Sequence, residues 1–258
     1  MTLRERFDDD MTTCPAAPMA FDDTPVTDTA LAALPDSAQR YLRYMGVVGR
    51  PADRGFRAHL FGRFRRRPAQ RWMRCEAWQH TSVAPVSRIF HLRLDFARVL
   101  PMYGRDTYLD GHGRMRATLF GLTVADGHGP ELDVGELVTF LNDAVVLAPS
   151  MLLRLPVMWT AVDDDSFDLS LTDHGTTVRA RVSLTAEGAP CDFTTEDRYA
   201  DLPGGLVRAR WSTPLLGWAG GTRPCPTHGS AIWHLPSGPF SYAEFDYSPA
   251  AIEYAPTA

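Results

Sequence analysis

The longest apolar run of the chain, at positions 136–151, has the spacing of a helix. It reads ELVTFLNDAVVLAPSM, and its apolar residues recur every three or four positions. Asp133, three residues before Glu136, is typical of a capping box at a helix start. The pattern predicts a buried helix. Asn142 and Asp143 lie in the middle of the run, and because an unpaired buried polar group costs about 1–3 kcal/mol, we expect both to have partners.

Before this run the pattern has a period of two, which is typical of half-buried strands. Strands are predicted at about 54–65, 72–80 and 88–97. In the third, RIFHLRLDFA, one face carries Phe90, Leu92, Leu94 and Phe96, and the other carries His91, Arg93 and Asp95. That second face is either solvated or the wall of a polar cavity.

Turn signals separate further predicted strands. Before the helix, two such strands are predicted around 105–113 and at 114–124. After the helix, one strand is predicted around Trp159, and others at about 167–172, 177–185, 192–199, 206–211, 231–235 and 240–247. The stretch LPDSAQRYLRYMG predicts a short helix that begins at Pro35 and ends at Gly46. The predicted class is α+β and β-dominated, with antiparallel sheet around one buried helix plus one or two short helices.

Residues 1–30 are acidic and lack periodicity, so the sequence predicts a disordered leader at 1–30 and a single antiparallel-sheet domain at 31–258. The four cysteines have no CxxC spacing, and no apolar signal segment precedes them. These features favour a reduced, cytoplasmic protein without a membrane span. The pattern leaves the oligomeric state open.

The composition excludes several kinds of chemistry. The chain has no lysine, so all 26 Lys+Arg residues are arginines, which excludes a Schiff-base lysine, a pyridoxal phosphate attachment site and a P-loop. The net charge of −5 argues against nucleic-acid binding. The arginine run at 63–67 is interpreted as a solvated edge that discourages strand pairing.

Metal, cofactor and nucleophile motifs are lacking. The histidines and cysteines have no ligand spacing, and no GxGxxG, GxxxxGK[ST] or GxSxG is found. We therefore predict no metal and no cofactor.

Asp197-Arg198-Tyr199 is the first candidate site. If the strand at 192–199 alternates throughout, Asp197 shares its more apolar face with Phe193. A carboxylate there would have a raised pKa and could act as a general acid or base, with Arg198 stabilising negative charge. The alternative is that Asp197 forms a structural ion pair with an arginine.

Two further groups are candidates. Asp143 could act as acid or base beside Asn142, or both could tie the helix to neighbouring backbone. Arg105, Asp106 and Tyr108, at a strand end, are either a binding group or a loop clamp.

Aromatic residues could line a pocket for an apolar small molecule, although tryptophans are more commonly core residues. The candidate substrate-binding side chains from this argument are Tyr199, Trp159, Trp211 and Trp233.

Several motifs in order resemble those of a large, uncharacterised bacterial family of the domain-of-unknown-function kind. They are LeuPro…ArgTyrLeu (34–42), GlyArgAspThrTyr…AspGlyHisGly (104–113), LeuAsnAsp…AlaPro (141–149), AspArgTyr (197–199), TrpSerThrPro (211–214) and Trp233. The resemblance implies a curved, half-barrel-like antiparallel sheet around helices, similar to bacterial lipoprotein carriers that hold apolar ligands in the concavity. It supplies no catalytic residue.

Two functions fit these observations. The first is a cofactor-independent enzyme, a cyclase, isomerase or lyase, that moves protons on an apolar small molecule through Asp143 or Asp197. The second is a non-catalytic carrier or sensor of a lipophilic ligand. Ionisable residues among apolar ones favour the enzyme, and the lack of a complete catalytic motif favours the carrier.

Overall fold

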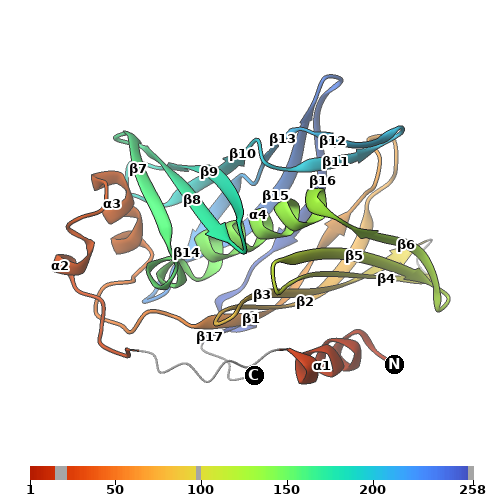
Figure 1. Ribbon diagram of the computed structural model, residues 1–258, viewed down its shortest axis with the longest axis horizontal. Coiled ribbons are helices and arrows are strands. Elements are labelled where there is room, and N and C mark those ends of the chain that lie inside the picture. Colours follow the sequence, from red (N-terminus) through yellow and green to blue (C-terminus); the bar gives the residue numbers. More distant parts are fainter. Residues whose placement is uncertain (15–21, 97–99, 255–258) are drawn as a thin grey trace.

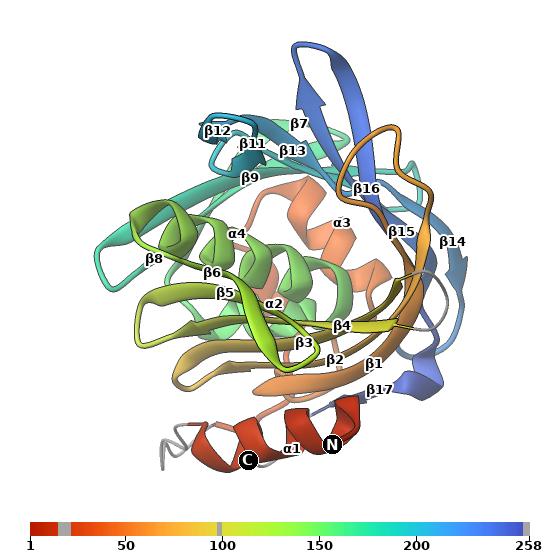
Figure 2. The same ribbon diagram turned by 90° about the vertical axis from the view of Figure 1, so that its right-hand side faces the viewer.

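A long helix lies against the concave face of a curved antiparallel sheet (Figures 1 and 2). The computed structural model describes residues 1–14, 22–96 and 100–254. The predicted class, α+β with a dominant curved antiparallel sheet around one buried helix, is confirmed.

The sheet contains 15 strands within the described residues. The strands before the long helix are β1 (Gly55–Phe64), β2 (Met73–Val83), β3 (Val86–Phe96), β4 (Leu100–Leu109), β5 (His112–Leu119) and β6 (Leu122–His128). Those after it are β7 (Val157–Asp163), β8 (Ser166–Asp173), β9 (Thr176–Leu184), β10 (Pro190–Thr195), β13 (Arg210–Ser212), β14 (Leu215–Ala219), β15 (Cys225–Leu235), β16 (Gly238–Asp246) and β17 (Ile252–Tyr254). A separate ribbon pairs β11 (Tyr199–Leu202) with β12 (Gly205–Arg208).

The two halves of the sheet meet where β1 pairs with β16. The order across the sheet is β6-β5-β4-β3-β2-β1-β16-β15-β13-β10-β9-β8-β7, with β14 beside β15 and β17 beside β1. The terminal strands β6 and β7 are not neighbours, so the sheet stays open. This curvature encloses the helix on three sides (Figure 2).

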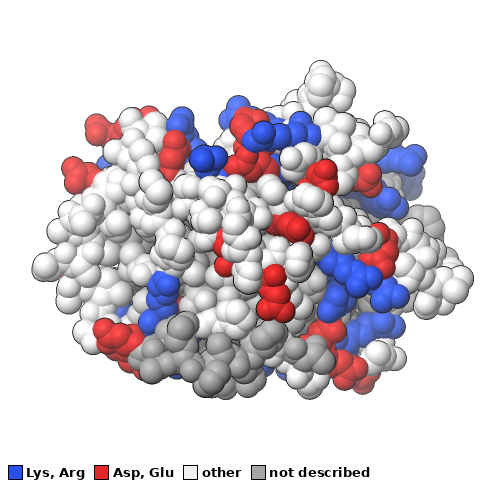
Figure 3. Space-filling model, viewed as in Figure 1, with Lys and Arg blue, Asp and Glu red and all other residues white. Residues whose placement is uncertain are grey.

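The arginine run at 63–67 is not at a sheet edge, so that prediction is wrong. β1 has β2 on one side and β16 on the other, and Arg63 pairs with Glu244 of β16 over 2.5 Å. Arg65 stacks on Trp72, with 4.4 Å between its guanidinium carbon and the ring centroid. Arg63 and Arg65 thus contact side chains next to β1, a strand inside the sheet. On the face shown in Figure 3, arginines and acidic residues lie next to one another.

The central helix α4 (Pro130–Leu147) starts earlier than predicted, and the short 3-10 helix η1 (Pro149–Arg154) follows it. Gly129 is the N-cap and Pro130 occupies the first turn, where its fixed φ suits a helix start. The predicted capping box is therefore wrong. Asp133 instead accepts a hydrogen bond from the Gly113 backbone N–H over 2.7 Å and ties α4 to β5.

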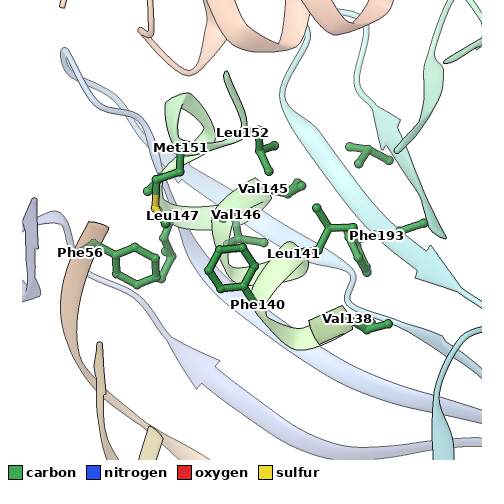
Figure 4. Close-up of a cluster of buried hydrophobic side chains, with 14 of the residues drawn as sticks. Phe56, Val138, Phe140, Leu141, Val145, Val146, Leu147, Met151, Leu152 and Phe193 are labelled. Atoms are coloured by element: carbon green, nitrogen blue, oxygen red, sulfur yellow. The ribbon is translucent and has the colours of Figure 1, made fainter. Parts of the chain in front are cut away.

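The main core lies between α4 and the concave face of the sheet. Figure 4 shows Phe140, Leu141 and Val145 of α4 among side chains from the strands, including Phe56 and Phe193. All five are at most 1% exposed, and burying such a side chain contributes about 1.5–3 kcal/mol. The helix thus fills the concavity.

The predicted helix at 35–45 is confirmed as α3 (Asp36–Tyr44), which follows the single-turn helix α2 (Asp28–Leu31). Tyr41 is fully buried, and its hydroxyl donates to the Val145 carbonyl over 2.7 Å. This contact joins α3 to the end of α4.

Part of the predicted disordered leader is ordered, which corrects that expectation. α1 (Leu3–Thr13) has a capping box between Thr2 and Glu5. It packs on the convex face of the sheet (Figure 2), where Phe7 is fully buried and Met11 contacts the same cluster. Three spaced apolar residues, Leu3, Phe7 and Met11, suffice to order the helix against β2 and β3. Residues 15–21 of that expectation lie outside the described residues.

One predicted strand is a hairpin. The segment predicted as a single strand at 114–124 is divided into β5 and β6 by Phe120 and Gly121, whose φ angles are 53° and 79°. Positive φ at both central residues is typical of a two-residue hairpin turn.

Among the described residues, no helix is long and apolar enough to cross a bilayer.

Candidate functional site

A pocket of about 140 Å³ lies between α4 and the concave face of the sheet. Its apolar wall comes mainly from α4, β1, β3, β15 and β16. The apolar lining residues are Leu60, Phe64, Phe90, Leu92, Val146, Leu147, Leu215, Ala231, Ala243 and Phe245. Its polar wall includes Gln79, Arg88, Asp106, Glu136, Asn142, Asp143, Arg198 and Thr213. A cavity of this volume is similar to one that admits benzene.

The lining changes character along α4. Glu136, Thr139 and Asp143 line the pocket along the middle of the helix, and Val146 and Leu147 line it at the C-terminal end. Eleven residues separate Glu136 from Leu147, a rise of about 16 Å along a helix axis. The pocket therefore has a polar end and an apolar end.

A buried arginine organises the polar end. Arg88 Nη1 donates to Glu136 Oε2 over 2.9 Å, and Arg88 Nε donates to Asp143 Oδ2 over 2.7 Å. The Asp143 oxygen also accepts a hydrogen bond from Gln79 Nε2 over 2.6 Å. The Arg88 side chain is 5% exposed, so these bonds compensate for the desolvation of its charge.

The strand register brings Asp106 to the same wall. Gln79 of β2 lies opposite Phe90 of β3, which lies opposite Asp106 of β4. Residues directly opposite one another in an antiparallel sheet point to the same face. The three side chains therefore form a row across the concave face, and all three line the pocket.

Two carboxyl groups of this wall hold protons unusually well. Burial and the neighbouring Glu136 carboxylate raise the pKa of Asp106 to about 7. Burial also raises the pKa of Glu136, against the opposing charge of Arg88. Like charges in a desolvated site disfavour joint ionisation, so the pair keeps a proton near neutral pH.

Arg198 faces the same pocket in a different setting. Its guanidinium carbon lies 4.4 Å from the Trp211 ring centroid and 5.5 Å from that of Trp233. Its Nε atom is buried and has no hydrogen-bond partner among the described residues. No carboxylate of the described chain forms a salt bridge with it, in contrast to Arg88.

Asn142 has a structural partner, which is a side chain and not the backbone named in the prediction. Its Oδ1 accepts a hydrogen bond from Thr213 Oγ1 over 2.6 Å, and both residues are buried. This bond ties α4 to the segment after β13. Of the predicted site residues, the pocket brings together Asn142, Asp143, Asp106, Arg198 and Trp211.

Asp197 lies outside the pocket lining, and it does not share the face of Phe193 as the sequence predicted. β10 ends at Thr195, and the alternation that would place Asp197 beside Phe193 stops there. The Asp197 carboxylate accepts hydrogen bonds from the Arg179 backbone N–H over 2.9 Å and from the Arg208 guanidinium. These contacts match the alternative prediction, in which Asp197 forms a structural ion pair with an arginine.

Arg105 faces the opposite side of the sheet from Asp106, so it does not belong to the binding wall. Adjacent residues of a strand point to opposite faces. Arg105 donates to the Asp10 carboxylate of α1, and His91 Nε2 lies 2.6 Å from the same carboxylate. The predicted Arg–Asp group is thus divided between the two faces.

The remaining predicted binding residues are not part of the pocket lining. Tyr108 is fully buried in the core and donates its hydroxyl to Asp173 over 2.7 Å. Trp159 packs on Phe167 with ring centroids 5.4 Å apart. Tyr199 belongs to the β11–β12 ribbon. The Trp233 ring packs near the Arg198 guanidinium, with 5.5 Å between the ring centroid and the guanidinium carbon.

Sequence reasoning missed Arg88, Glu136 and Gln79. Arg88 has the same parity as Phe90, Leu92 and Leu94, so its charge falls on the apolar face of β3. Glu136, Phe140 and Asp143 follow the helical spacing of four and three. The signal that could have found them was a basic residue on the apolar face of β3 and acidic residues on a buried face of α4, which together predict a buried ion pair.

No group of three or more His, Cys, Asp or Glu side chains within the described ranges is arranged to hold a metal ion. The four cysteines form no disulfide, and three of them are buried. The ionisable groups that line the pocket are carboxyls, guanidiniums and the phenols of Tyr242 and Tyr247.

Residues 24–245 match the model of a family of unknown function, DUF6544, and the chain belongs to this family. No curated protein matches the sequence.

Two solved structures share part of the architecture. A domain described as an outer membrane lipoprotein-sorting protein from Vibrio parahaemolyticus is 11% identical, with a TM-score of 0.37 over 78% of this chain and 85% of that one. A DUF1329 family protein from Desulfovibrio piger is 10% identical, with a TM-score of 0.33 over 84% of this chain and 91% of that one. At this similarity neither structure informs the function.

Proposed function

We propose that this protein binds a small, largely apolar molecule in the pocket beside α4 and acts as a carrier or sensor. The observation that carries the proposal is the contrast between the two ends of the pocket. Its apolar end is lined by side chains such as Val146, Leu147 and Phe245. Binding of an apolar ligand there is favourable because it removes apolar surface from water.

The condition of the predicted acid/base residues supports binding rather than catalysis. Asp143 is held by Arg88 and Gln79, and Asp197 is held outside the pocket by Arg208. Both carboxylates are already engaged in salt bridges of the fold. These two groups therefore serve the fold.

One observation favours a second function, cofactor-independent proton transfer. Asp106 lines the pocket with a pKa raised to about 7, and a general acid or base is most effective when its pKa is near the working pH. In this second proposal Asp106, and not Asp143 or Asp197, exchanges the proton.

The test is native mass spectrometry of the protein purified from its host, followed by release and identification of bound small molecules. We expect a stoichiometric apolar molecule in the wild type and none in Ala231→Phe, which places a ring in the pocket. Ala161→Phe, at an exposed position of β7, is the matched control and retains the molecule.

Equal amounts of ligand in Ala231→Phe and the wild type would contradict binding in this pocket. If the protein converts a component of host extract and Asp106→Asn abolishes this conversion, the enzyme proposal would replace the carrier proposal.

A further inference from the structure

Arg198 is a charged side chain of the pocket that forms no salt bridge within the described residues. The other pocket arginine, Arg88, is fully engaged with Glu136 and Asp143. Arg198 has no salt bridge in the described chain, and its buried Nε has no hydrogen-bond partner there. An unsatisfied buried donor loses hydration without compensation, so a ligand acceptor at this position would be stabilising.

The guanidinium is also held in place. It lies over Trp211, which is 2% exposed, and Trp233 packs nearby. Trp211 Nε1 donates to the Tyr242 hydroxyl over 3.1 Å, which fixes the indole ring. An arginine stacked on a fixed aromatic surface loses little conformational entropy when it binds an anion.

Asp106 is a second ionisable group of the pocket that forms no hydrogen bond or salt bridge within the described residues, and the charge of Arg198 acts on it. A carboxyl group that keeps its proton is a hydrogen-bond donor. A guanidinium and a carboxylic acid on one wall match the two oxygens of a carboxylate.

We propose that the Arg198 guanidinium and the Asp106 carboxyl group together bind the carboxylate of a small amphipathic acid, whose apolar part lies toward Leu147. This inference rests on the proposed function and adds the chemical class of the ligand. The length of the polar-to-apolar gradient along α4 and the pocket volume favour a short alkyl or single-ring acid.

The two-donor arrangement makes binding dependent on pH. Asp106 donates only while protonated, and its pKa is about 7. The charged groups that act on Asp106 are Arg88 of β3, Glu136 of α4 and Arg198 after β10, together with Arg105, which lies on the other face of its own strand. Glu136 favours the protonated form and the three arginines oppose it. Above neutral pH, the ionised Asp106 would repel the ligand carboxylate.

Isothermal titration calorimetry with hexanoate, hexanol and hexylamine tests the proposal on the wild type. We expect hexanoate to bind at least tenfold more tightly than hexanol at about pH 6, where an alkyl carboxylate is ionised. From a pKa of about 7, hexanoate affinity should fall roughly 30-fold between about pH 6 and about pH 8.5, and hexanol affinity should not change.

Three variants identify the groups. Arg198→Met keeps the packing on Trp211 and should lose the preference for hexanoate, Arg198→Lys should restore part of it, and the exposed Arg181→Met is the matched control. Asp106→Asn supplies a permanent N–H donor, so its hexanoate affinity should be independent of pH and exceed that of the wild type at about pH 8.5. Circular dichroism and thermal unfolding verify that each variant is folded.

The outcomes separate the two proposals. Hexanol that binds as tightly as hexanoate, a preference for hexylamine, or a preference that survives in Arg198→Met overturns the carboxylate site and leaves the apolar pocket in place. Failure of both hexanol and hexanoate to bind overturns both proposals.

Discussion

Arg88 of β3 crosses the interior to α4, where its Nε lies 2.7 Å from Asp143 Oδ2. The same guanidinium reaches Glu136, about two turns earlier on the helix, over 2.9 Å. Since both carboxylates belong to α4, a single arginine sets the position of the helix against the sheet. This position defines the polar end of the pocket.

Replacing Arg88 should strongly destabilise the fold. Arg88→Met leaves Glu136 and Asp143 buried without their cation, and breaking a buried ion pair costs about 3–5 kcal/mol. Urea unfolding of the variant measures this loss. The triple variant that also carries Glu136→Leu and Asp143→Leu is the control, since apolar replacement of a whole buried ion group is often neutral or stabilising. A loss below about 1 kcal/mol in Arg88→Met would show that the cluster does not position α4.

Asp197→Asn should reduce stability and leave ligand binding unchanged. The variant weakens the charged bond to Arg208 at a site outside the pocket lining, and hydrogen bonds to charged groups contribute about 1.5–3 kcal/mol. Urea unfolding and hexanoate titration on the same preparations separate the two effects. Weaker ligand binding with unchanged stability would return Asp197 to the candidate site.

The pairing of Asp10 with the sheet should hold α1 in place in a pH-dependent way. Burial raises the pKa of Asp10, but the hydrogen bonds with His91 and Arg105 outweigh it and lower the pKa to about 2. A depressed carboxyl pKa gives stability that is present above about pH 4 and is lost as the pH falls to about 2. Because the group is partly exposed, we expect about 1 kcal/mol.

The measurement is the difference in unfolding free energy between the wild type and Asp10→Asn from neutral to acid pH, with amide hydrogen exchange of α1. Asp9→Asn, at an exposed position of the same helix, is the matched control. Equal exchange of α1 in Asp10→Asn and Asp9→Asn would contradict the role of Asp10.

His80 should make the protein sensitive to mild acid. The residue is 2% exposed in β2, and burial and the charge of Arg57 lower its pKa to about 4. The fold favours the neutral ring, so the stabilisation is complete above the unfolded pKa of about 6.5 and is lost as the pH falls to about 4. The full effect is about 3 kcal/mol.

Comparison of the wild type with His80→Gln isolates this contribution, because Asp106 contributes with the opposite sign. The raised pKa of Asp106 gives stability below about pH 4 that is lost as the pH rises to about 7. The unfolding free energies of the wild type and His80→Gln should converge or cross on acidification, and those of His174→Gln should follow the wild type. Parallel curves for His80→Gln would contradict the assignment.

The period of the sequence predicted the elements well where one face of an element is uniformly apolar. β1 and β3 alternate throughout, and α4 is apolar on most sides, so their buried faces could be recognised. The start of α4 was placed wrongly because Pro130 and Gly129 dominate the local geometry there. The order of α1 depends on a few contacts to a distant strand surface, which no local pattern reveals.

The candidate site could be predicted only in part, for a similar reason. Asn142 and Asp143 were found because they interrupt an apolar run, and Asp106 was found because it lies beside Arg105 at a predicted strand end. The partners of Asn142 and Asp143 come from β2, β3 and the segment after β13, and the register that brings them together is a long-range property. The two faces of β4 separate Arg105 from Asp106, although the residues are adjacent in sequence.

The most direct test of the central claim is a crystal structure of the protein soaked with hexanol. The account predicts an ordered hexanol molecule in the pocket between α4 and the concave face of the sheet, with its carbon chain against Val146, Leu147 and Phe245 and its hydroxyl toward Arg198. Ordered water alone in the pocket, or hexanol bound only elsewhere on the molecule, would contradict a ligand-binding function for this cavity.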